Sequence, residues 1–323
     1  MTKIYTIESP ARIHLGFMEL DDKASRLFGS VGLAITGFKN KQQIQPYSKF
    51  EVICSDPDIK IKIMNVIQLF SKTFDIRKCK ITVFDFIPLH QGLGSGTQIS
   101  LCTGFLLSKF NKLKLSVDDI SKFLKRGQRS GIGVETFKSG GVVIDLGKKK
   151  KSIYPPLKLI SIKWPKDWQI ILLTDKKFSG LFGEQEIKEF SKLQNIKNDF
   201  VKENSFNILM KVIPGLLEKD FDPFVNGIQS IQENMSKIFY GKKNHFFSTS
   251  ISKIFNMLRE KNYLGFGQSS WGPTSFIFCK NKIKRQKILN IIENFIELKK
   301  IEGINLINVN GRNFGNREIK VKK

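Results

Sequence analysis

Apolar and polar residues fall into short strand-like runs through the first half of the chain. These runs predict strands over Lys3–Ile7 with a continuation through Ala11–Phe17, Val31–Ile35, Phe50–Cys54, Ile81–Phe86 and Val142–Leu146. Apolar residues recur at helical spacing over Ile61–Phe70, which predicts a helix between two of these strands. A second helix is expected after Ser116, a residue type that caps helix starts, with the cations of Lys125–Arg129 near its end.

The second half of the chain is richer in helical patterns. Its predicted helices are Glu184–Lys192, Phe200–Leu217, Phe221–Phe239, Ser248–Lys261 and Lys284–Leu298, and its predicted strands are Gln169–Thr174, Thr274–Cys279 and Gly303–Val309. Helices and strands mix in both halves without regular alternation, which favours the α+β class. The lysine run Lys148–Lys151 and the pair Pro155-Pro156 interrupt the pattern. We therefore predict two domains, residues 1–155 and residues 156–323.

The most informative segment is residues 88–100, which read PLHQGLGSGTQIS between a strand pattern and a helical pattern. The glycines Gly92, Gly94 and Gly96 let the backbone turn sharply and approach a ligand closely. Thr97 is a candidate N-cap for the helix that follows. Unpaired N–H groups at a helix start attract anions, and phosphate is the natural one. The spacing matches neither the P-loop nor the dinucleotide fingerprint, so a plain connecting loop is the alternative.

Cations stand at two other places in the chain. Arg12 and His14 alternate in a strand-like run, so they share one face, where they could bind an anion or move a proton. Arg126 and Arg129 precede the glycine-rich turn at Gly131, and each offers a planar fork for phosphate or carboxylate. The alternatives are an ordinary strand edge and the capping of a helix end by cations.

Two further glycine-rich segments lie in the second half. Residues 178–184, FSGLFGE, read as a glycine loop that enters a helix with Glu184 in its first turn. Residues 265–274, GFGQSSWGPT, concentrate hydroxyls, an amide and an indole before a strand. Such a composition suits a ligand pocket that has polar groups for orientation and a flat face for stacking. A structural turn is the alternative.

Composition restricts the class of protein. The 323 residues suffice for two domains, and 41% hydrophobic with 11% aromatic residues support packed cores. We see no apolar run long enough for a membrane span and no signal peptide, so no membrane partner is expected. The four scattered cysteines favour free thiols over a disulfide framework or a zinc site. These features together predict a cytoplasmic protein.

The net charge of +25 would attract nucleic acid, anionic membranes or polyanionic small molecules. The lysines are spread along the chain, and the dense runs are Lys148–Lys151 and the tail Lys320, Lys322 and Lys323, which are typical of solvated loops and termini. No nucleic-acid-binding motif stands out. Nucleic-acid binding without catalysis is therefore the less favoured interpretation.

Several of these segments, taken in order, resemble one family. Residues 88–100 resemble the phosphate-binding loop of the GHMP kinase superfamily, and the branch that they match is β-ribofuranosylaminobenzene 5′-phosphate synthase (RFAP synthase). The segments that resemble this branch are residues 11–17, 91–98, 129–133, 180–184 and 267–274. The resemblance implies a two-domain fold with an N-terminal ribosomal-protein-S5-like domain and a C-terminal ferredoxin-like α/β-sandwich domain.

The resemblance also implies a reaction. A glycosyltransferase of this kind condenses phosphoribosyl pyrophosphate with 4-hydroxybenzoate or 4-aminobenzoate, releases CO₂ and pyrophosphate, and makes a β-ribofuranosyl-arene 5′-phosphate for tetrahydromethanopterin synthesis. An archaeal source and Mg²⁺ on the diphosphate are expected, pyridoxal phosphate is not, and homo-oligomerisation is left open. An ATP-dependent small-molecule kinase on the same fold is the second candidate. Such kinases often carry Ser-Gly-x-Asp, but Gly133 stands where this aspartate would be, and Glu135 is two residues away.

The predicted site combines these segments. The catalytic candidates are His14, Arg12, Arg129 and Glu135. The candidates for binding substrate and phosphate are Gln91, Gly92, Gly94, Ser95, Gly96, Thr97, Gln98, Arg126, Gly131, Gly183, Glu184, Gln268, Ser269, Ser270, Trp271 and Thr274. Trp271 or a phenylalanine is expected to stack on the arene, and His14 to orient its para group or its carboxylate. No metal ligand can be assigned from the sequence.

Overall fold

The computed structural model describes residues 4–20, 24–178, 198–240, 248–270 and 272–319. The strands are β1 (Tyr5–Glu19), β2 (Arg26–Pro46), β3 (Glu51–Ile53), β4 (Cys79–Asp85), β5 (Val142–Asp145), β6 (Lys148–Lys149), β7 (Lys158–Ile162), β8 (Gln169–Asp175), β9 (Phe266–Gln268), β10 (Ser275–Cys279), β11 (Ile304–Val309) and β12 (Arg317–Ile319). The helices are α1 (Pro57–Thr73), α2 (Ser95–Phe110), α3 (Val117–Phe123), α4 (Ile132–Ser139), α6 (Asn198–Asn207), α7 (Ile213–Glu218), α8 (Phe221–Tyr240), α9 (Thr249–Glu260) and α10 (Lys282–Leu298), with a π-helical turn η1 (Ile208–Val212). This mixture confirms the predicted α+β class.

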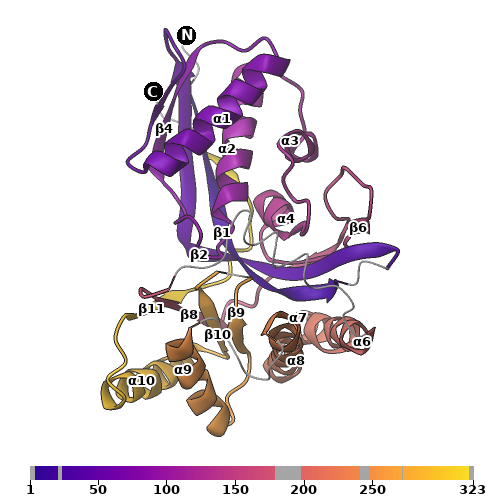
Figure 1. Cartoon of the computed structure of the whole chain (residues 1–323), viewed down its shortest axis with the longest axis vertical. Helices are drawn as coiled ribbons and strands as arrows, with labels where there is room; N and C mark the ends of the chain where they lie inside the picture. The colour runs from indigo at the N-terminus through magenta and orange to yellow at the C-terminus, as the bar shows by residue number, and fades with distance from the viewer. Residues whose placement is uncertain (1–3, 21–23, 179–197, 241–247, 271, 320–323) are drawn as a thin grey trace.

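The first sheet is built on the long antiparallel hairpin of β1 and β2 and has the strand order β12-β1-β2-β4-β3. β5 and β6 pair with β2, and β7 pairs with β5. Helices α1 and α2 lie over one face of this sheet (Figure 1). The core between them joins Ile7, Ile44 and Ile81 of the strands to Ile63 and Phe70 of α1. The predicted strand Val31–Ile35 is only the middle of β2, because the hairpin continues the pairing on both sides.

Helix α1 shows how local chemistry sets an element boundary. The Asp56 side chain accepts a hydrogen bond from the N–H of Ile59 at 2.9 Å, and Pro57 occupies the first turn. The helix therefore begins four residues before the predicted Ile61–Phe70 segment. Its buried face follows helical spacing through Ile59, Ile63, Val66, Ile67 and Phe70.

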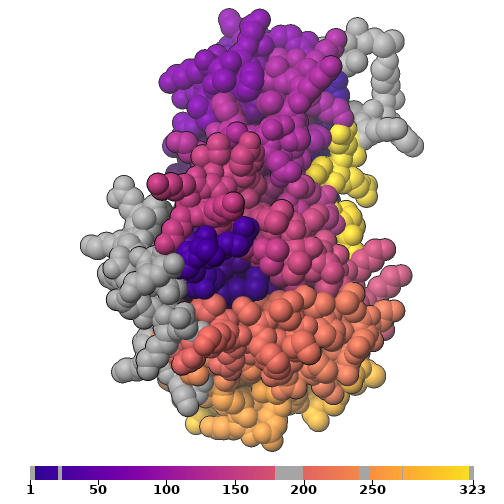
Figure 2. Space-filling model, turned by 90° about the vertical axis from the view of Figure 1, so that its right-hand side faces the viewer, coloured from indigo at the N-terminus to yellow at the C-terminus, as the bar shows by residue number. Residues whose placement is uncertain are grey.

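The second sheet is fully antiparallel and has the order β11-β8-β10-β9. Alternate residues of β8 point to opposite faces. Ile171 and Leu173 pack in a core with α9 and α10, whereas Ile170 and Leu172 belong to a core shared with β1, β2 and α8. The second half of the molecule is thus docked on the β1–β2 hairpin. In Figure 2 part of this hairpin, in indigo, is visible between the magenta surface of the first half and the orange helices of the second.

The predicted division between residues 155 and 156 remains a prediction. In the structure β7 follows this point and pairs with β5, and β12 near the end of the chain pairs with β1. The first sheet therefore contains strands from both sides of the division.

One helix predicted for the second half is divided in the structure, and another lies outside the described residues. The predicted helix Phe200–Leu217 consists of α6, η1 and α7. The hydrogen-bond pattern changes from α-helical to π-helical in η1, just before Pro214, which has no N–H for the usual hydrogen bond. The predicted helix Glu184–Lys192 lies outside the described residues. None of the helices in the described part of the chain is long and apolar enough to cross a membrane.

Candidate active site

A cleft of about 330 Å³ opens where the two halves of the molecule meet. Its walls come from β1, from the glycine segment before α2, from the loop between α3 and α4, and from the turn after β9. This volume lies within the range of small-molecule sites. Segments far apart in the sequence therefore converge on one concave surface.

The glycine segment presents the start of α2 to this cleft. The N-cap is Gly94, in a left-handed conformation with φ +81°, and no side chain caps the helix. The predicted N-cap Thr97 is wrong, since Thr97 lies within the first turn, and Ser95, Gly96 and Thr97 all line the cleft. Because no described side chain makes a capping hydrogen bond to this helix, its first-turn N–H groups and the positive end of its dipole remain available to an anion.

Arg12 joins β1 to this segment. Its backbone N–H donates to the carbonyl of Leu93 at 3.1 Å, and its Nη1 donates to the carbonyl of Gly92 at 2.6 Å. A Cβ on Gly94 would lie only 3.1 Å from Arg12 Nε. The guanidinium thus packs directly against the glycine backbone beside the start of α2.

The turn after β9 closes against the same glycines. Ser269 Oγ donates to the carbonyl of Gly92 at 2.7 Å and accepts from the backbone N–H of His14 at 3.0 Å. Gly92 has φ +74°, and a Cβ there would come within 2.5 Å of the Ser269 carbonyl oxygen. Only glycine fits this contact, because any side chain would separate the two loops.

The charge of the cleft is strongly positive. Arg12, Lys125, Arg126 and Arg129 all line it, and none of the lining residues that the structure describes is Asp or Glu. Lys125–Arg129 were predicted near the end of the helix that Ser116 caps; α3 ends at Phe123 with Leu124 as its C-cap, so these residues lie just beyond the helix and form the loop before α4. Burial lowers the pKa of Arg126. Such a lining suits a ligand with several negative charges.

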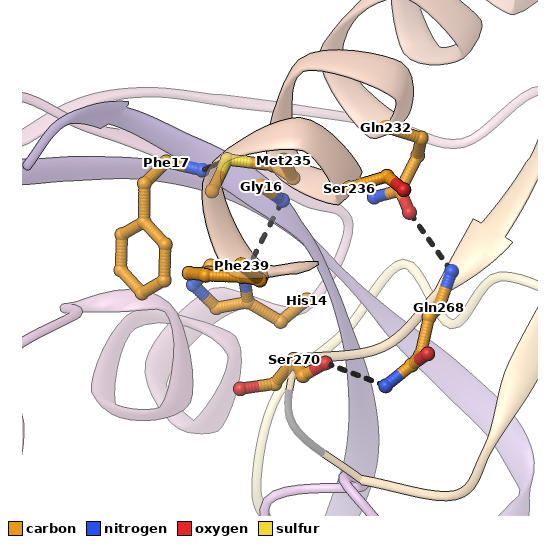
Figure 3. A pocket seen from close by; sticks show the side chains of 9 residues that line it. All are labelled: His14, Gly16, Phe17, Gln232, Met235, Ser236, Phe239, Gln268 and Ser270. Atoms are coloured by element: carbon orange, nitrogen blue, oxygen red, sulfur yellow. Dashed lines mark hydrogen bonds between the residues drawn. The ribbon is translucent and has the colours of Figure 1, made fainter. Parts of the chain in front are cut away.

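His14 lies at the boundary between the cleft and a small side chamber (Figure 3). The side chain is 3% exposed, and burial, with a smaller contribution from Arg12, lowers its pKa to about 3. Its Nδ1 accepts from the N–H of Gly16 at 3.3 Å, so the proton of the neutral ring is on Nε2. Nε2 has no hydrogen-bond partner among the described residues. The ring is therefore a neutral hydrogen-bond donor.

The side chamber lies between β1, helix α8 and the end of β9. Met235 and Phe239 supply apolar surface, as Figure 3 shows. Gln232 fixes the opposite wall, since its Nε2 donates to the Leu15 carbonyl at 2.7 Å and its Oε1 accepts from the Gln268 N–H at 2.8 Å. Phe17 packs against His14 with ring centroids 4.4 Å apart. The chamber is therefore a small recess of about 20 Å³ beside the cleft, with His14 between the two.

Comparison with known proteins identifies the family. Residues 62–142 match the model for the GHMP kinases N terminal domain. The chain is 33% identical to the β-ribofuranosylphenol 5′-phosphate synthase of Archaeoglobus fulgidus over 239 residues, which cover 70% of this chain and 75% of that protein. The chain belongs to the β-ribofuranosylphenol 5′-phosphate synthase family. It is also 29% identical to the synthase of the same name from Methanocaldococcus jannaschii, over 90% of this chain and 94% of that protein.

The fold of this family member is shared with proteins of much lower sequence identity. The mevalonate diphosphate decarboxylase of Staphylococcus aureus superposes with a TM-score of 0.67 at 15% identity, covering 99% of each chain. Together with the GHMP kinase model, this confirms the predicted two-domain GHMP-kinase-like fold.

Not every predicted site residue of this synthase-family chain lies in the cleft. Glu135 lies on α4, is 4% exposed, and pairs with Lys138 at 2.8 Å and with Lys158 at 3.3 Å. It lines a separate cavity with Arg26. The structure therefore does not bring Glu135 together with His14, because the expected turn at Gly131–Glu135 is the start of a helix that directs this carboxylate to another surface.

The other predicted residues support the cleft from behind or lie outside the described chain. Gln98 is buried, and its Nε2 donates to the Gly133 carbonyl at 2.7 Å. Gly131 is the N-cap of α4, and Thr274 is buried, with its carbonyl bonded to Ser269. Gln91 contributes backbone that lies against Gly272. Gly183, Glu184 and Trp271 lie outside the described residues.

Sequence reasoning missed several residues of this site. Those that line the cleft but were not predicted are Phe17, His90, Lys125, Gly127, Gln128, Ser130 and Gly272. Ser130 and Gly272 stand inside motifs already quoted for the family resemblance, so their neighbours were a usable signal. Asp145, buried behind Ser130, ends a short strand and carried no signal of its own.

Proposed function

We propose that this chain is a decarboxylating phosphoribosyltransferase. Its substrates would be phosphoribosyl pyrophosphate and 4-hydroxybenzoate or 4-aminobenzoate, and its product a β-ribofuranosyl-arene 5′-phosphate for tetrahydromethanopterin synthesis. The names of its relatives support this proposal. The observation that carries it is a cleft with cations, an uncapped helix start and no described carboxylate in its lining, next to a neutral imidazole.

The donor carries a 5′-phosphate and a diphosphate, so it needs several anion-binding groups at once. The first-turn N–H groups of α2, together with Arg12, Arg126 and Arg129, supply them from three segments. Pyrophosphate leaves from ribose C1 while positive charge grows on the sugar ring. Fixed donors that stabilise the departing anion are the main electrostatic contribution expected here.

The arene attacks through the ring carbon that bears its carboxylate. Loss of CO₂ afterwards restores aromaticity, and the para substituent supplies the electrons, so no external electron sink is required. His14 has the properties to orient this acceptor, because its Nε2–H is a donor without a described protein partner and faces the para group or the carboxylate in this proposal. A ring whose pKa is about 3 stays neutral near pH 7, so its role is donation rather than ion pairing.

Mg²⁺ is part of the proposal only as an ion carried in by the donor. The described lining offers the hydroxyls of Ser95, Thr97, Ser130 and Ser270 but no carboxylate, and the described chain has no cluster of metal-ligating side chains. Mg²⁺ usually needs one or two carboxylates beside substrate phosphates. These residues do not fit a protein-held Mg²⁺, and we derive no step through it.

The kinase alternative is less favoured. Kinases of this fold often use the aspartate of Ser-Gly-x-Asp as the base for the acceptor hydroxyl, and here neither Gly133 nor Glu135 places a carboxylate in the described cleft lining. The deciding experiment incubates the protein with phosphoribosyl pyrophosphate and each benzoate, and measures pyrophosphate and CO₂. Release of both with one benzoate supports the proposal. Release of ADP from ATP with neither product would contradict it.

The setting of the reaction belongs to the same proposal. All four cysteines are free, and Cys79, Cys102 and Cys279 are buried. A reducing cytoplasm would keep them so. Small anionic substrates account for the positive cleft without nucleic acid as a partner.

A further inference from the structure

A buried carboxylate lies directly behind the wall of the cleft. Asp145, at the end of β5, is 0% exposed and accepts hydrogen bonds from the N–H groups of Gly131 at 3.0 Å and Gly147 at 2.9 Å. Its Oδ2 also accepts from Ser30 Oγ at 2.6 Å. No ion pair to Asp145 is present among the described contacts, which is unusual for a buried acid.

The hydroxyl of Ser30 continues from this carboxylate to the cleft. Ser30 Oγ lies 2.7 Å from Ser130 Oγ, and Ser130 lines the cleft. An ionised carboxylate only accepts, so Ser30 gives its single proton to Asp145 and must accept from Ser130. The hydroxyl proton of Ser130 is thereby directed inward. One of its two oxygen lone pairs accepts from the Ile132 N–H at 3.3 Å, and the other is left for a donor on the cleft side. A carboxylate that only capped α4 would not need this two-hydroxyl extension.

The geometry points to a proton relay in which Ser130 takes a proton from the para hydroxyl or amino group of the arene and passes it through Ser30 to Asp145. This inference rests on the proposed function. Ser130 would be the group that touches the substrate, and Asp145 the buried group that holds the proton. Burial raises the pKa of Asp145 to about 6, which brings it near the working pH of a general base.

The chemistry balances without another reagent. As the ring carbon bonds to ribose C1, the C1–O bond breaks and its electron pair leaves with pyrophosphate. The para O–H or N–H loses its proton to Ser130 in the same phase, because electron donation into the ring makes that group acidic. When the bond between the ring carbon and the carboxylate breaks, CO₂ leaves and the electron pair of that bond stays in the ring, which becomes aromatic again. The relay then returns the proton to the para group.

The charged groups on the elements packed around Asp145 are bonded to other partners. On β2, the Arg26 guanidinium donates to the carbonyls of Leu146 and Gly147. On α4, Glu135 is paired with Lys138 and Lys158. Beyond β5, Lys148 donates to Gln128 and to the Ser152 carbonyl. The contacts of all these groups that are described here go to partners other than Asp145.

The test compares Ser130→Ala with Ser108→Ala. Ser108 is a buried serine of α2 that donates to the Leu113 carbonyl at 2.7 Å and does not line the cleft, so it controls for the loss of a buried hydroxyl. We expect wild-type kcat for pyrophosphate release, at saturating donor and benzoate, to fall about tenfold per pH unit below about pH 6. Ser130→Ala should lower kcat about a hundredfold and lose this dependence, whereas Ser108→Ala should keep both.

Two kinetic results would overturn the relay. One is a Ser130→Ala enzyme with wild-type kcat. The other is a Ser130→Ala enzyme that keeps the acid limb, which would then belong to the phosphate groups of the donor. Asp145→Asn is the second variant, and it should lose the same limb if it folds.

An infrared titration separates the relay from the reaction itself. The wild-type spectrum minus that of Asp145→Asn isolates the Asp145 carboxyl band in the protein without substrate. We expect its midpoint near pH 6. Ser130→Ala should move the midpoint upward, because Ser30 without its partner Ser130 makes a weaker hydrogen bond to the Asp145 carboxylate. A midpoint unchanged by Ser130→Ala overturns the relay. If wild type releases no pyrophosphate with either benzoate, the proposed function fails, and this titration still decides the relay.

Discussion

Two glycines of α2 allow the anion site to be tested separately from stability. Gly96 lies in the first turn and lines the cleft, and a Cβ built on it has no neighbouring atom within 4 Å. Gly104 lies further along the same helix, where a Cβ would come within 2.6 Å of Ile120 Cγ2. The same substitution, glycine to alanine, should therefore have opposite effects at the two positions.

For Gly96→Ala we expect a protein at least as stable as wild type. Alanine is favoured over glycine in a helix by up to about 1 kcal/mol, and the methyl group meets only the open cleft. That methyl group would keep a phosphate oxygen from approaching the first-turn N–H groups to about 3 Å, the distance of a hydrogen bond. Losing one charge-assisted hydrogen bond costs about 1.5–3 kcal/mol, which corresponds to a Kd raised roughly 10- to 150-fold.

For Gly104→Ala we expect the reverse. Crowding against Ile120 should lower the free energy of unfolding by about 1–3 kcal/mol, while binding per folded molecule stays at the wild-type value. Urea unfolding measures the first quantity, and calorimetric titration with phosphoribosyl pyrophosphate or pyrophosphate measures the second. Wild-type affinity in Gly96→Ala would refute the reasoning, because the phosphate would then lie away from the start of α2.

Three further outcomes follow from the site. The pKa of His14 is about 3 in the folded protein and 6.5 in the unfolded chain, so its contribution to stability is present above pH 6.5 and is lost as the pH falls. At about pH 4.5 this lowers the free energy of unfolding by about 3 kcal/mol, and urea unfolding of His14→Gln should not show this loss. Ser269→Ala leaves the Gly92 carbonyl and the His14 N–H without this partner and should lower the free energy of unfolding by about 1–3 kcal/mol in the same assay. Arg126→Ala should raise KM for the donor about tenfold or more and affect kcat less, and an unchanged KM at low salt would exclude Arg126 from donor binding.

Much of this architecture could be predicted from local pattern. Helix α10 was expected over Lys284–Leu298 and runs from Lys282 to Leu298, because its apolar spacing and its start are both local signals. Strands such as β9 and β12 were missed, because each is only three residues long and exists through pairing with β10 or β1. Three residues are too few to show a periodic pattern, whether the partner follows directly, as β10 follows β9, or lies at the other end of the chain, as β1 does for β12.

The candidate site divides in the same way. Arg12, His14 and the glycines before α2 could be selected because residue type and spacing restrict what they do. The positions of Lys125–Arg129 and of Glu135 could not be predicted, because their surroundings depend on where α3 ends and α4 begins. Because α4 begins at Ile132, Arg129 stays in the loop that lines the cleft, whereas Glu135 lies on the helix and lines a separate cavity. Asp145 was missed since only tertiary structure brings it near Ser130.

The packing of α4 against α2 explains why position 133 brings no carboxylate into the part of the cleft wall that the structure describes. A Cβ on Gly133 would lie 3.1 Å from the Thr97 methyl carbon, and the Gly133 carbonyl already holds the side chain of Gln98. An aspartate at this position would therefore push against the first turn of α2, which is the surface that we assign to phosphate. A cleft that keeps this close contact must obtain its proton acceptor from elsewhere, and the Ser130–Ser30–Asp145 chain reaches it from behind the wall without adding negative charge next to the diphosphate.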